Sequence, residues 1–175
     1  MTIQELEKFI EKYGKSIYSF CRKLSTDNDF ADELYQEVWL KVMQDIDKIK
    51  TSGNVKSYLL SLAVGIWKNH KKKYAVRDRI APKITLTDEI EQNVMDNSQD
   101  ILEQVIAEER KQAVLEAVSK LDDVYRIPIL LFYMEGQSVK EIAKELHIPE
   151  GTVKRRLWSA RKKLSKELEV YIDHE

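Results

Sequence analysis

The sequence predicts an all-α protein built of two small helical domains that a flexible acidic linker joins. Three observations support this fold class. The chain of 175 residues contains only 5 glycines and 3 prolines, whereas average usage would give about 21 residues of these helix-breaking types. Apolar residues recur at helical spacing in two blocks. Between the blocks this periodicity fades and acidic residues predominate, which is typical of a linker.

The first domain, residues 1–79, should contain three amphipathic helices. Thr2 and Glu5 have the spacing of a capping box, which sets the start of the first helix. A short polar turn precedes the second helix, which should end near Asp47. A break at residues 51–54 precedes the third helix, which begins with apolar residues and ends in lysines. The pattern therefore predicts a small bundle with one strongly basic end.

Residues 80–107 are expected to form the acidic linker, and the second domain should cover residues 108–175. Helical periodicity already resumes near Ile101. Two aspartates at 122–123 should open a further helix. Pro128 lies within that helix, where a proline removes a backbone hydrogen bond and crowds the preceding turn. We therefore expect a delayed start or a kink there.

The end of the second domain has the pattern of a helix-turn-helix motif. Ser138 and Glu141 have capping-box spacing and open a short helix. A second helix is expected from Glu150 onward, with basic residues spread over its outer face. Where the two helices cross, Ala143 supplies a small side chain, and Ile148 supplies an apolar residue for the turn. An ordinary surface hairpin is the alternative, but it would require none of these features together.

The second helix of this motif is the predicted recognition helix. It should enter the major groove of DNA with its N-terminus first, so that its early residues lie near base edges and its later cations approach phosphates. The candidate DNA contacts are Glu150, Thr152, Lys154, Arg155, Arg156, Ser159, Arg161 and Lys162.

The formal net charge of −1 hides an uneven distribution. Residues 1–79 carry 15 basic and 11 acidic side chains, residues 80–108 carry 1 and 7, and residues 109–175 carry 13 and 12. Basic residues concentrate further at 68–79 and 154–166. Two basic stripes separated by an acidic segment are what two phosphate-contacting modules would show. Two solvated helix faces are the alternative interpretation.

Several classes of protein are disfavoured by the composition. Cys21 is the only cysteine, which excludes an internal disulfide and multi-cysteine metal sites. The three histidines form no HExxH pair, so we expect no metal, no cofactor and no enzymatic activity, although a metal-dependent carboxylate enzyme stays a minor alternative. No apolar run approaches the roughly 18 residues of a membrane span, and the N-terminal residues lack a signal-peptide pattern. We expect a cytoplasmic protein without membrane insertion.

Motifs in both domains occur in an order that a known family shares. The second domain carries Glu141-Ile142-Ala143, then Gly151-Thr152-Val153-Lys154, then Ala160-Arg161. With these motifs, residues 121–161 resemble region 4 of bacterial RNA polymerase sigma factors. In the first domain, residues 31–40 and 57–64 resemble sigma region 2. Together the matches cover residues 5–79 and 108–168, and the chain resembles the extracytoplasmic function (ECF) subfamily.

The resemblance implies an alternative sigma factor, which binds core RNA polymerase, directs it to specific promoters and assists promoter melting. The second helix of the first domain would dock on the polymerase. Asp32, Gln36 and Trp39 lie at helical spacings and share a mixed polar and apolar face, which suits a partner helix. The residues that the resemblance assigns to polymerase binding are Asp32, Gln36, Glu37 and Trp39.

Promoter melting needs a pocket for a base drawn out of the duplex, formed by a polar loop beside a helix with cations. The loop at residues 50–54 is such a loop, and the resemblance implies that it captures a base of the minus-ten element. The second domain would recognise the minus-thirty-five element. The expected partners are core RNA polymerase and promoter DNA, and an anti-sigma factor could cover the same exposed faces. The candidate minus-ten contacts are Thr51, Ser52, Asn54, Lys56, Lys68, Asn69 and Lys72.

Three positions depart from the family pattern. Tyr58 stands where a tryptophan is usual, Gly65 where an asparagine is usual, and Asp122 where a proline is usual. Base preferences of other members therefore cannot be transferred to this chain. Gly65 also costs about 1 kcal/mol relative to alanine in a helix interior.

Two other functions compete with the sigma factor interpretation. A stand-alone helix-turn-helix transcriptional regulator would need a signal-sensing first domain, but residues 1–79 show neither alternating strands and helices nor a glycine-rich phosphate loop. A helical scaffold without a nucleic-acid role would leave both basic stripes unexplained. Transcription with core polymerase separates these alternatives, because only a sigma factor confers promoter-specific initiation.

Overall fold

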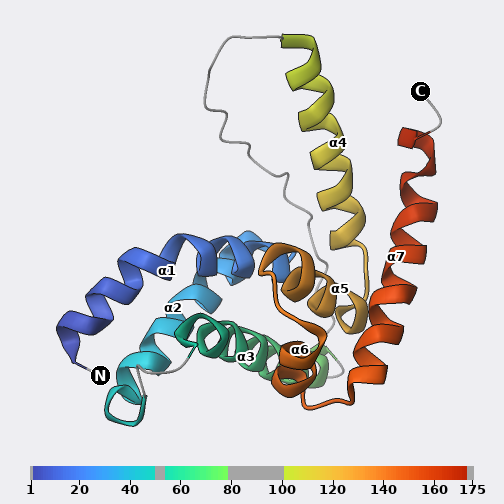
Figure 1. Ribbon diagram of the computed structural model, residues 1–175. Coiled ribbons are helices and arrows are strands. Elements are labelled where there is room, and N and C mark those ends of the chain that lie inside the picture. Colours follow the sequence, from blue (N-terminus) through green and yellow to red (C-terminus); the bar gives the residue numbers. More distant parts are fainter. Residues whose placement is uncertain (1, 50–53, 79–100, 173–175) are drawn as a thin grey trace.

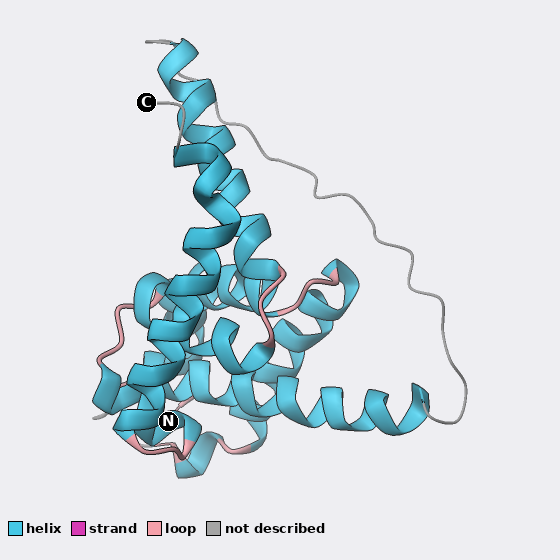
Figure 2. Cartoon of the chain, turned by 90° about the vertical axis from the view of Figure 1, so that its right-hand side faces the viewer, coloured by secondary structure: helices cyan, strands magenta, loops and turns pink. Residues whose placement is uncertain are grey.

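The structure, a computed structural model, describes residues 2–49, 54–78 and 101–172. In these ranges every regular element is a helix, which confirms the predicted all-α class (Figures 1 and 2). Most of the predicted acidic linker lies outside the described residues. The helices are α1 (Ile3–Leu24), α2 (Asn28–Gln44), the 3₁₀ helix η1 (Ile46–Lys48), α3 (Val55–Asp78), α4 (Ile101–Ser119), α5 (Asp123–Ile129), the π-helix η2 (Leu130–Met134), α6 (Val139–Leu146) and α7 (Glu150–Ile172).

Helices α1, α2 and α3 pack together and form the N-terminal module. The predicted capping box is present, because the Glu5 amide donates to Thr2 Oγ1 at 3.2 Å and the Thr2 amide donates to Glu5 Oε2 at 2.7 Å. The core between the three helices buries apolar side chains completely, among them Phe20, Leu34 and Leu59. These side chains recur at helical spacing in the sequence, so periodicity alone located this core.

Helix α2 ends three residues earlier than the sequence predicted. Its start is set by Asp27, whose Oδ1 accepts a hydrogen bond from the Phe30 amide at 3.2 Å. At its end, Asp45 leaves the helical conformation with φ −103° and ψ 18°, and η1 continues the chain as a tighter 3₁₀ turn. Apolar Ile46 packs against the core from this turn, which is why the periodic pattern extended past the helix.

Helices α4 to α7, with η2, form the C-terminal module. Helix α4 begins at Ile101, where periodicity resumes, so its first turns lie inside the segment assigned to the linker. Helices α4 and α7 run side by side away from the other elements (Figure 1). Such an arrangement leaves both long helices with one solvent-facing side.

Near Pro128 the sequence predicts a delayed start or a kink, and of these two the delayed start is wrong. Helix α5 begins at Asp123 and contains Pro128, which is buried. The irregularity follows the proline as η2, in which the Glu135 amide donates to the Leu130 carbonyl at 3.2 Å. This five-residue spacing is that of a π-helix, a form in which one extra residue fits into a helical turn.

The helix-turn-helix prediction agrees with the structure. Helix α6 is opened by the predicted capping box of Ser138 and Glu141. It ends at His147, which adopts the left-handed conformation with φ 55°, and Ile148 packs partly against the core. Ala143 is buried where α6 meets α7, as the packing argument required.

The two modules touch each other, which the sequence did not predict. Helix α1 contacts η2 and α4, and α3 contacts α6. Figure 1 shows α6 lying beside α3 in the same arrangement. In the described part of the chain, no helix is both long enough and apolar enough to cross a membrane.

Candidate nucleic-acid interface

Helix α7 presents its basic residues away from the core. Val153, Leu157 and Ala160 are buried, and their spacing leaves the opposite face of the helix to polar and charged side chains. All eight predicted contacts therefore lie on one helix, in the order that the helix-turn-helix prediction requires. Among them, Thr152, Arg156 and Ser159 are half-buried, and Glu150, Lys154, Arg155, Arg161 and Lys162 are exposed.

Trp158 is a candidate contact that the sequence prediction missed. It lies on the basic face of α7 with 60% of its surface exposed, and Lys162 Nζ lies 5.4 Å from the centroid of its ring. An exposed tryptophan beside cations can pack against sugars or thymine methyl groups in a groove. Its position three residues after Arg155 and four before Lys162 was the signal that could have identified it.

Asn54, from the predicted minus-ten loop, caps helix α3. Its Oδ1 accepts a hydrogen bond from the Ser57 amide at 3.1 Å, while the residue itself is exposed. Thr51 and Ser52 lie outside the described residues. Removing an N-cap side chain of this type costs about 1 kcal/mol, so substitution of Asn54 would affect the start of α3 as well as any base contact.

The predicted contacts on α3 divide into two groups. Asn69 and Lys72 are exposed and directed to solvent. Lys56 and Lys68 instead lie close to charged groups of the C-terminal module. Lys56 Nζ is 2.7 Å from Glu135 Oε2, and the pKa of Lys68 is lowered by partial burial and by the nearby Arg156.

The predicted polymerase-binding residues do not share one surface. Asp32 and Gln36 are exposed, and Asp32 Oδ1 accepts a hydrogen bond from the Tyr18 hydroxyl at 2.9 Å. Trp39 is only 7% exposed, because it lies at the border of the helix face and its ring packs edge-on against Tyr35. Glu37 accepts hydrogen bonds from His70 Nε2. Trp39 is therefore buried in the core, whereas Asp32 and Gln36 of the predicted mixed face are exposed.

Two residues missed by the sequence prediction extend the exposed face of α2. Leu40 and Met43 are each 55% exposed. Gln36 follows Asp32 by four residues, Leu40 follows Gln36 by four, and Met43 follows Leu40 by three. These spacings place all four residues on one side of the helix. This surface, here called the α2 stripe, combines an acidic residue, an amide and two large apolar side chains.

One cluster in the described residues has metal-ligand chemistry. The ligand atoms of Glu33, Glu37 and His70 lie within 4.8 Å of one another. Glu33 is exposed, whereas His70 Nε2 lies 2.9 Å from Glu37 Oε2. This contact joins α2 to α3 directly, so we assign these residues a structural role.

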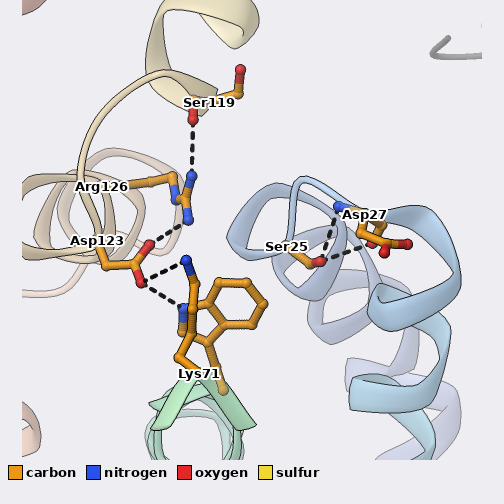
Figure 3. Close-up of polar contacts among 7 residues, drawn as sticks. Ser25, Asp27, Lys71, Ser119, Asp123 and Arg126 are labelled. Carbon is orange, nitrogen blue, oxygen red and sulfur yellow. Dashed lines mark hydrogen bonds and ion pairs between the residues drawn. The ribbon is translucent and has the colours of Figure 1, made fainter. Parts of the chain in front are cut away.

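A buried cation organises the border between the modules (Figure 3). Arg126 is 4% exposed, pairs with Asp123 and donates from Nη1 to the Ser119 carbonyl at 2.9 Å. Burial lowers the pKa of Arg126, while Asp123 opposes this shift. Asp123 also accepts a hydrogen bond from Trp67 Nε1 at 3.3 Å and lies 3.6 Å from Lys71 Nζ. Asp123 thus faces both modules.

Comparisons with known proteins agree with this architecture. A family model of sigma-70 region 2 matches residues 9–77, and one of sigma-70 region 4 matches residues 111–164. The ECF RNA polymerase sigma factor SigW of Bacillus subtilis (strain 168) is 24% identical over 161 residues, which is 91% of this chain and 86% of that protein. SigM of the same organism is 26% identical over 165 residues, which is 94% of this chain and 93% of that protein.

A solved structure shows the same fold. The sigma factor RpoE from Bartonella quintana, determined in complex with the anti-sigma factor NepR, superposes with a TM-score of 0.79 at 20% identity. The match covers 96% of this chain and 99% of that chain. Because both sigma regions occur in this order, and because the relatives align over nearly the whole chain, the protein belongs to the extracytoplasmic function sigma factors and acts as an alternative sigma factor in transcription initiation.

Proposed function

We propose that this sigma factor divides promoter recognition between its two modules and binds core RNA polymerase through α2. The observation that carries the proposal is the pair of basic helices. Helix α7 exposes cations at the end of a capped helix-turn-helix, and α3 exposes a second basic face. Two such surfaces on separate modules suit two DNA elements at a set distance from each other.

In the C-terminal module, α7 would read the minus-thirty-five element in the major groove. Lys154 and Arg155 are exposed near the helix N-terminus, where side chains of a recognition helix reach base edges. Arg161 and Lys162 lie further along the helix and would contact phosphates. Such contacts supply affinity without sequence preference.

In the N-terminal module, α3 and the loop before it would engage the minus-ten element. Asn69 and Lys72 are exposed on α3 and suit the backbone of a separated strand. Thr51, Ser52 and Asn54 would hold the flipped base. Lys56 and Lys68 would join these contacts once their partners in the C-terminal module are displaced.

The α2 stripe would dock on core polymerase. Exposed Leu40 and Met43 beside polar Asp32 and Gln36 give an apolar centre with a polar edge, which is the usual composition of a protein interface. Glu37 would act indirectly by holding α2 against α3. Trp39 would support the stripe from the core.

We further infer an anti-sigma factor as a partner and the cytoplasm as the site of action. The structurally similar RpoE was determined with the anti-sigma factor NepR bound, and the surfaces of this chain that suit polymerase and DNA could be covered in the same way. A protein that acts on polymerase and chromosomal DNA works in the cytoplasm. The proposed activity is binding, so it needs no catalytic residue.

In vitro transcription tests the proposed function. Core RNA polymerase is mixed with the full chain and with fragmented genomic DNA of the source organism, and transcript starts are mapped. We expect starts at a defined set of promoters, and the Leu40→Ala, Met43→Ala double variant should lower their yield. The double variant Val114→Ala, Val124→Ala, which removes apolar side chains exposed on other helices, is the control. DNA binding without any initiation would instead indicate a stand-alone regulator.

A further inference from the structure

A hydrogen bond joins the α2 stripe to the neighbouring helix α1. The Tyr18 hydroxyl on α1 donates to Asp32 Oδ1 at 2.9 Å. Tyr18 keeps 38% of its surface exposed, and Asp32 is exposed as well. A hydrogen bond between two exposed groups replaces hydrogen bonds to water and adds little to stability. Folding alone therefore does not account for this contact.

The Tyr18 ring is held in place by two further aromatic rings. It packs edge-on against Tyr35, with ring centroids 5.3 Å apart and an interplanar angle of 80°. Tyr35 in turn packs edge-on against buried Trp39, with ring centroids 6.2 Å apart and the same angle. Edge-to-face pairs of this kind are favourable and directional. The row of three rings therefore fixes the direction from which the hydroxyl reaches Asp32.

Gly14 allows this row of rings to lie close to α1. A Cβ atom at Gly14 would lie 3.1 Å from the Tyr35 hydroxyl oxygen, which is tighter than an ordinary van der Waals contact. Gly14 precedes Tyr18 by four residues, so both lie on the same side of α1. Glycine in a helix interior is unfavourable relative to alanine. The close approach of Tyr35 is thus obtained at the expense of helix stability.

The contact restricts a carboxylate that would otherwise rotate freely. Ordering a flexible side chain during binding lowers affinity, and a side chain that is already ordered avoids this loss. The pKa of Tyr18 is raised, chiefly by the hydrogen bond to Asp32 and then by desolvation, while Arg22 opposes the shift. The phenol therefore remains a donor throughout the neutral pH range. An ionised carboxylate accepts several hydrogen bonds, so Asp32 can bind a cation while Tyr18 holds it.

We propose that Tyr18 is a positioning residue for polymerase binding, which holds the Asp32 carboxylate at the edge of the α2 stripe in the orientation that a cationic side chain of core polymerase requires. The inference rests on the proposed docking of the α2 stripe. It gives α1 a part in that docking which acts through Asp32 and does not require Tyr18 to touch polymerase. A lysine or arginine of the partner fits this carboxylate, because such charge-assisted hydrogen bonds are strong and directional.

Removing a single oxygen atom tests the proposal. Tyr18→Phe keeps the ring that packs against Tyr35 and removes the hydroxyl that donates to Asp32. The full chain, labelled with a fluorophore at its N-terminus, is titrated with core RNA polymerase. We expect Tyr18→Phe to raise the Kd about fivefold, which corresponds to the ordering of one side chain. Tyr13→Phe, the same change at a half-buried tyrosine of α1, is the matched control and should leave the Kd unchanged.

A double-variant cycle distinguishes positioning from a direct contact or a purely structural role. Asp32→Asn removes the charge itself and should weaken polymerase binding at least as much as Tyr18→Phe does. Adding Tyr18→Phe to Asp32→Asn should then cause little further loss, because both changes interrupt one interaction. Urea unfolding of the two single variants and the double variant measures their stability. A structural role would lower stability without this non-additivity in polymerase binding.

The outcomes separate this inference from the proposed docking. An unchanged Kd for Tyr18→Phe, additive losses in the cycle, or a loss of binding that follows a loss of stability overturns the positioning role. The Leu40→Ala, Met43→Ala double variant reports on the α2 stripe itself. If it weakens polymerase binding while Tyr18→Phe does not, the docking stands and the positioning role falls. If neither variant changes the Kd, both proposals fall.

Discussion

Asp123 forms an ion pair with Arg126, whose guanidinium is buried away from water. Arg126 is almost fully buried, and its guanidinium hydrogen-bonds to Asp123 and to the Ser119 carbonyl. Transfer of an unpaired charge from water into a protein interior is costly. The pair with Asp123 is therefore needed to keep this buried cation compensated.

Replacing Asp123 with alanine should destabilise the C-terminal module. Removing one member of a buried ion pair costs roughly 3–5 kcal/mol, and because Asp123 is partly exposed we expect a loss near the lower end of this range. Urea unfolding measures the change. Asp122→Ala is the control, since Asp122 is exposed and makes no side-chain capping bond. Equal losses in the two variants would contradict a special role for Asp123.

Glu145 should make the stability of the protein depend on pH. Burial raises its pKa to about 7, although the hydrogen bond from Gln137 and the charge of Lys68 oppose the shift, and Glu135 and Glu141 add to it. The folded protein then holds a proton that the unfolded chain releases above a pKa near 4.5. Stability contributed by this group is therefore lost as the pH rises from about 4.5 to about 7.

The Glu145→Gln variant tests this dependence. Glutamine keeps the size of the side chain but carries no charge, so the variant should melt at a higher temperature than the parent near pH 8 and differ little near pH 5. Thermal unfolding at both pH values measures the effect, and Glu109→Gln is the exposed control. A melting temperature difference that is the same at both pH values would show that Glu145 does not titrate in this range.

Two tryptophans mark the limit of sequence prediction at single residues. Trp39 was expected on a binding surface and is buried, while Trp158 was overlooked and is exposed. Helical spacing places a Cα on a face, but a large ring at the border of that face can turn toward the core or away from it. Which way it turns depends on neighbours such as Tyr35, whose position the sequence does not reveal.

At the scale of elements, α7 combines a stable inner face with a DNA-binding outer face. Trp158 belongs to the outer face only, so Trp158→Ala should weaken duplex DNA binding about fivefold, equivalent to about 1 kcal/mol, while unfolding stability changes by less than about 0.5 kcal/mol. Fluorescence anisotropy with a promoter duplex measures the first effect. Tyr133→Ala, at a residue equally exposed on η2, is the control and should leave DNA binding unchanged.

Helix boundaries were predictable where side chains set them. Both capping boxes appear in the sequence and in the structure. In each, a hydroxyl and a carboxylate three residues apart accept hydrogen bonds from backbone amides that have no partner within the first turn of the helix. The π-helix η2 was not predictable. Its extra residue reflects how Pro128 and the apolar residues after it pack in the core, and no local pattern encodes that fit.

At the scale of the whole molecule, the sequence predicted two modules but not their contact. Each module has its own periodic core, which a sequence displays directly. The border between them depends on isolated charges such as Glu135 and Lys56, which are more than 70 residues apart and resemble ordinary surface residues in sequence. The sequence therefore predicts Lys56 and Lys68 as candidate DNA contacts, but it does not predict the charged groups of the C-terminal module that lie near them.

Raising the salt concentration should separate the two modules. Raising the ionic strength from about 0.1 M to about 1 M shortens the screening length from about 10 Å to about 3 Å, which weakens the partly exposed Lys71–Asp123 pair in particular. We expect the radius of gyration from small-angle X-ray scattering to increase with salt in the parent protein. Glu135→Gln should already be expanded at low salt. Scattering that is independent of both salt and substitution would show that these ion pairs do not hold the modules together.

The π-helical turn at Leu130–Met134 sets how the residues after it are rotated relative to helix α5. One residue of an α-helix corresponds to about 100° of rotation. Because the π-helical turn already holds one extra residue, the insertion of a further residue in η2 would turn everything beyond it by about that angle relative to α5, although it would change no charge, cap or recognition side chain. This short apolar segment should therefore tolerate an inserted residue less well than a substitution of one of its exposed side chains.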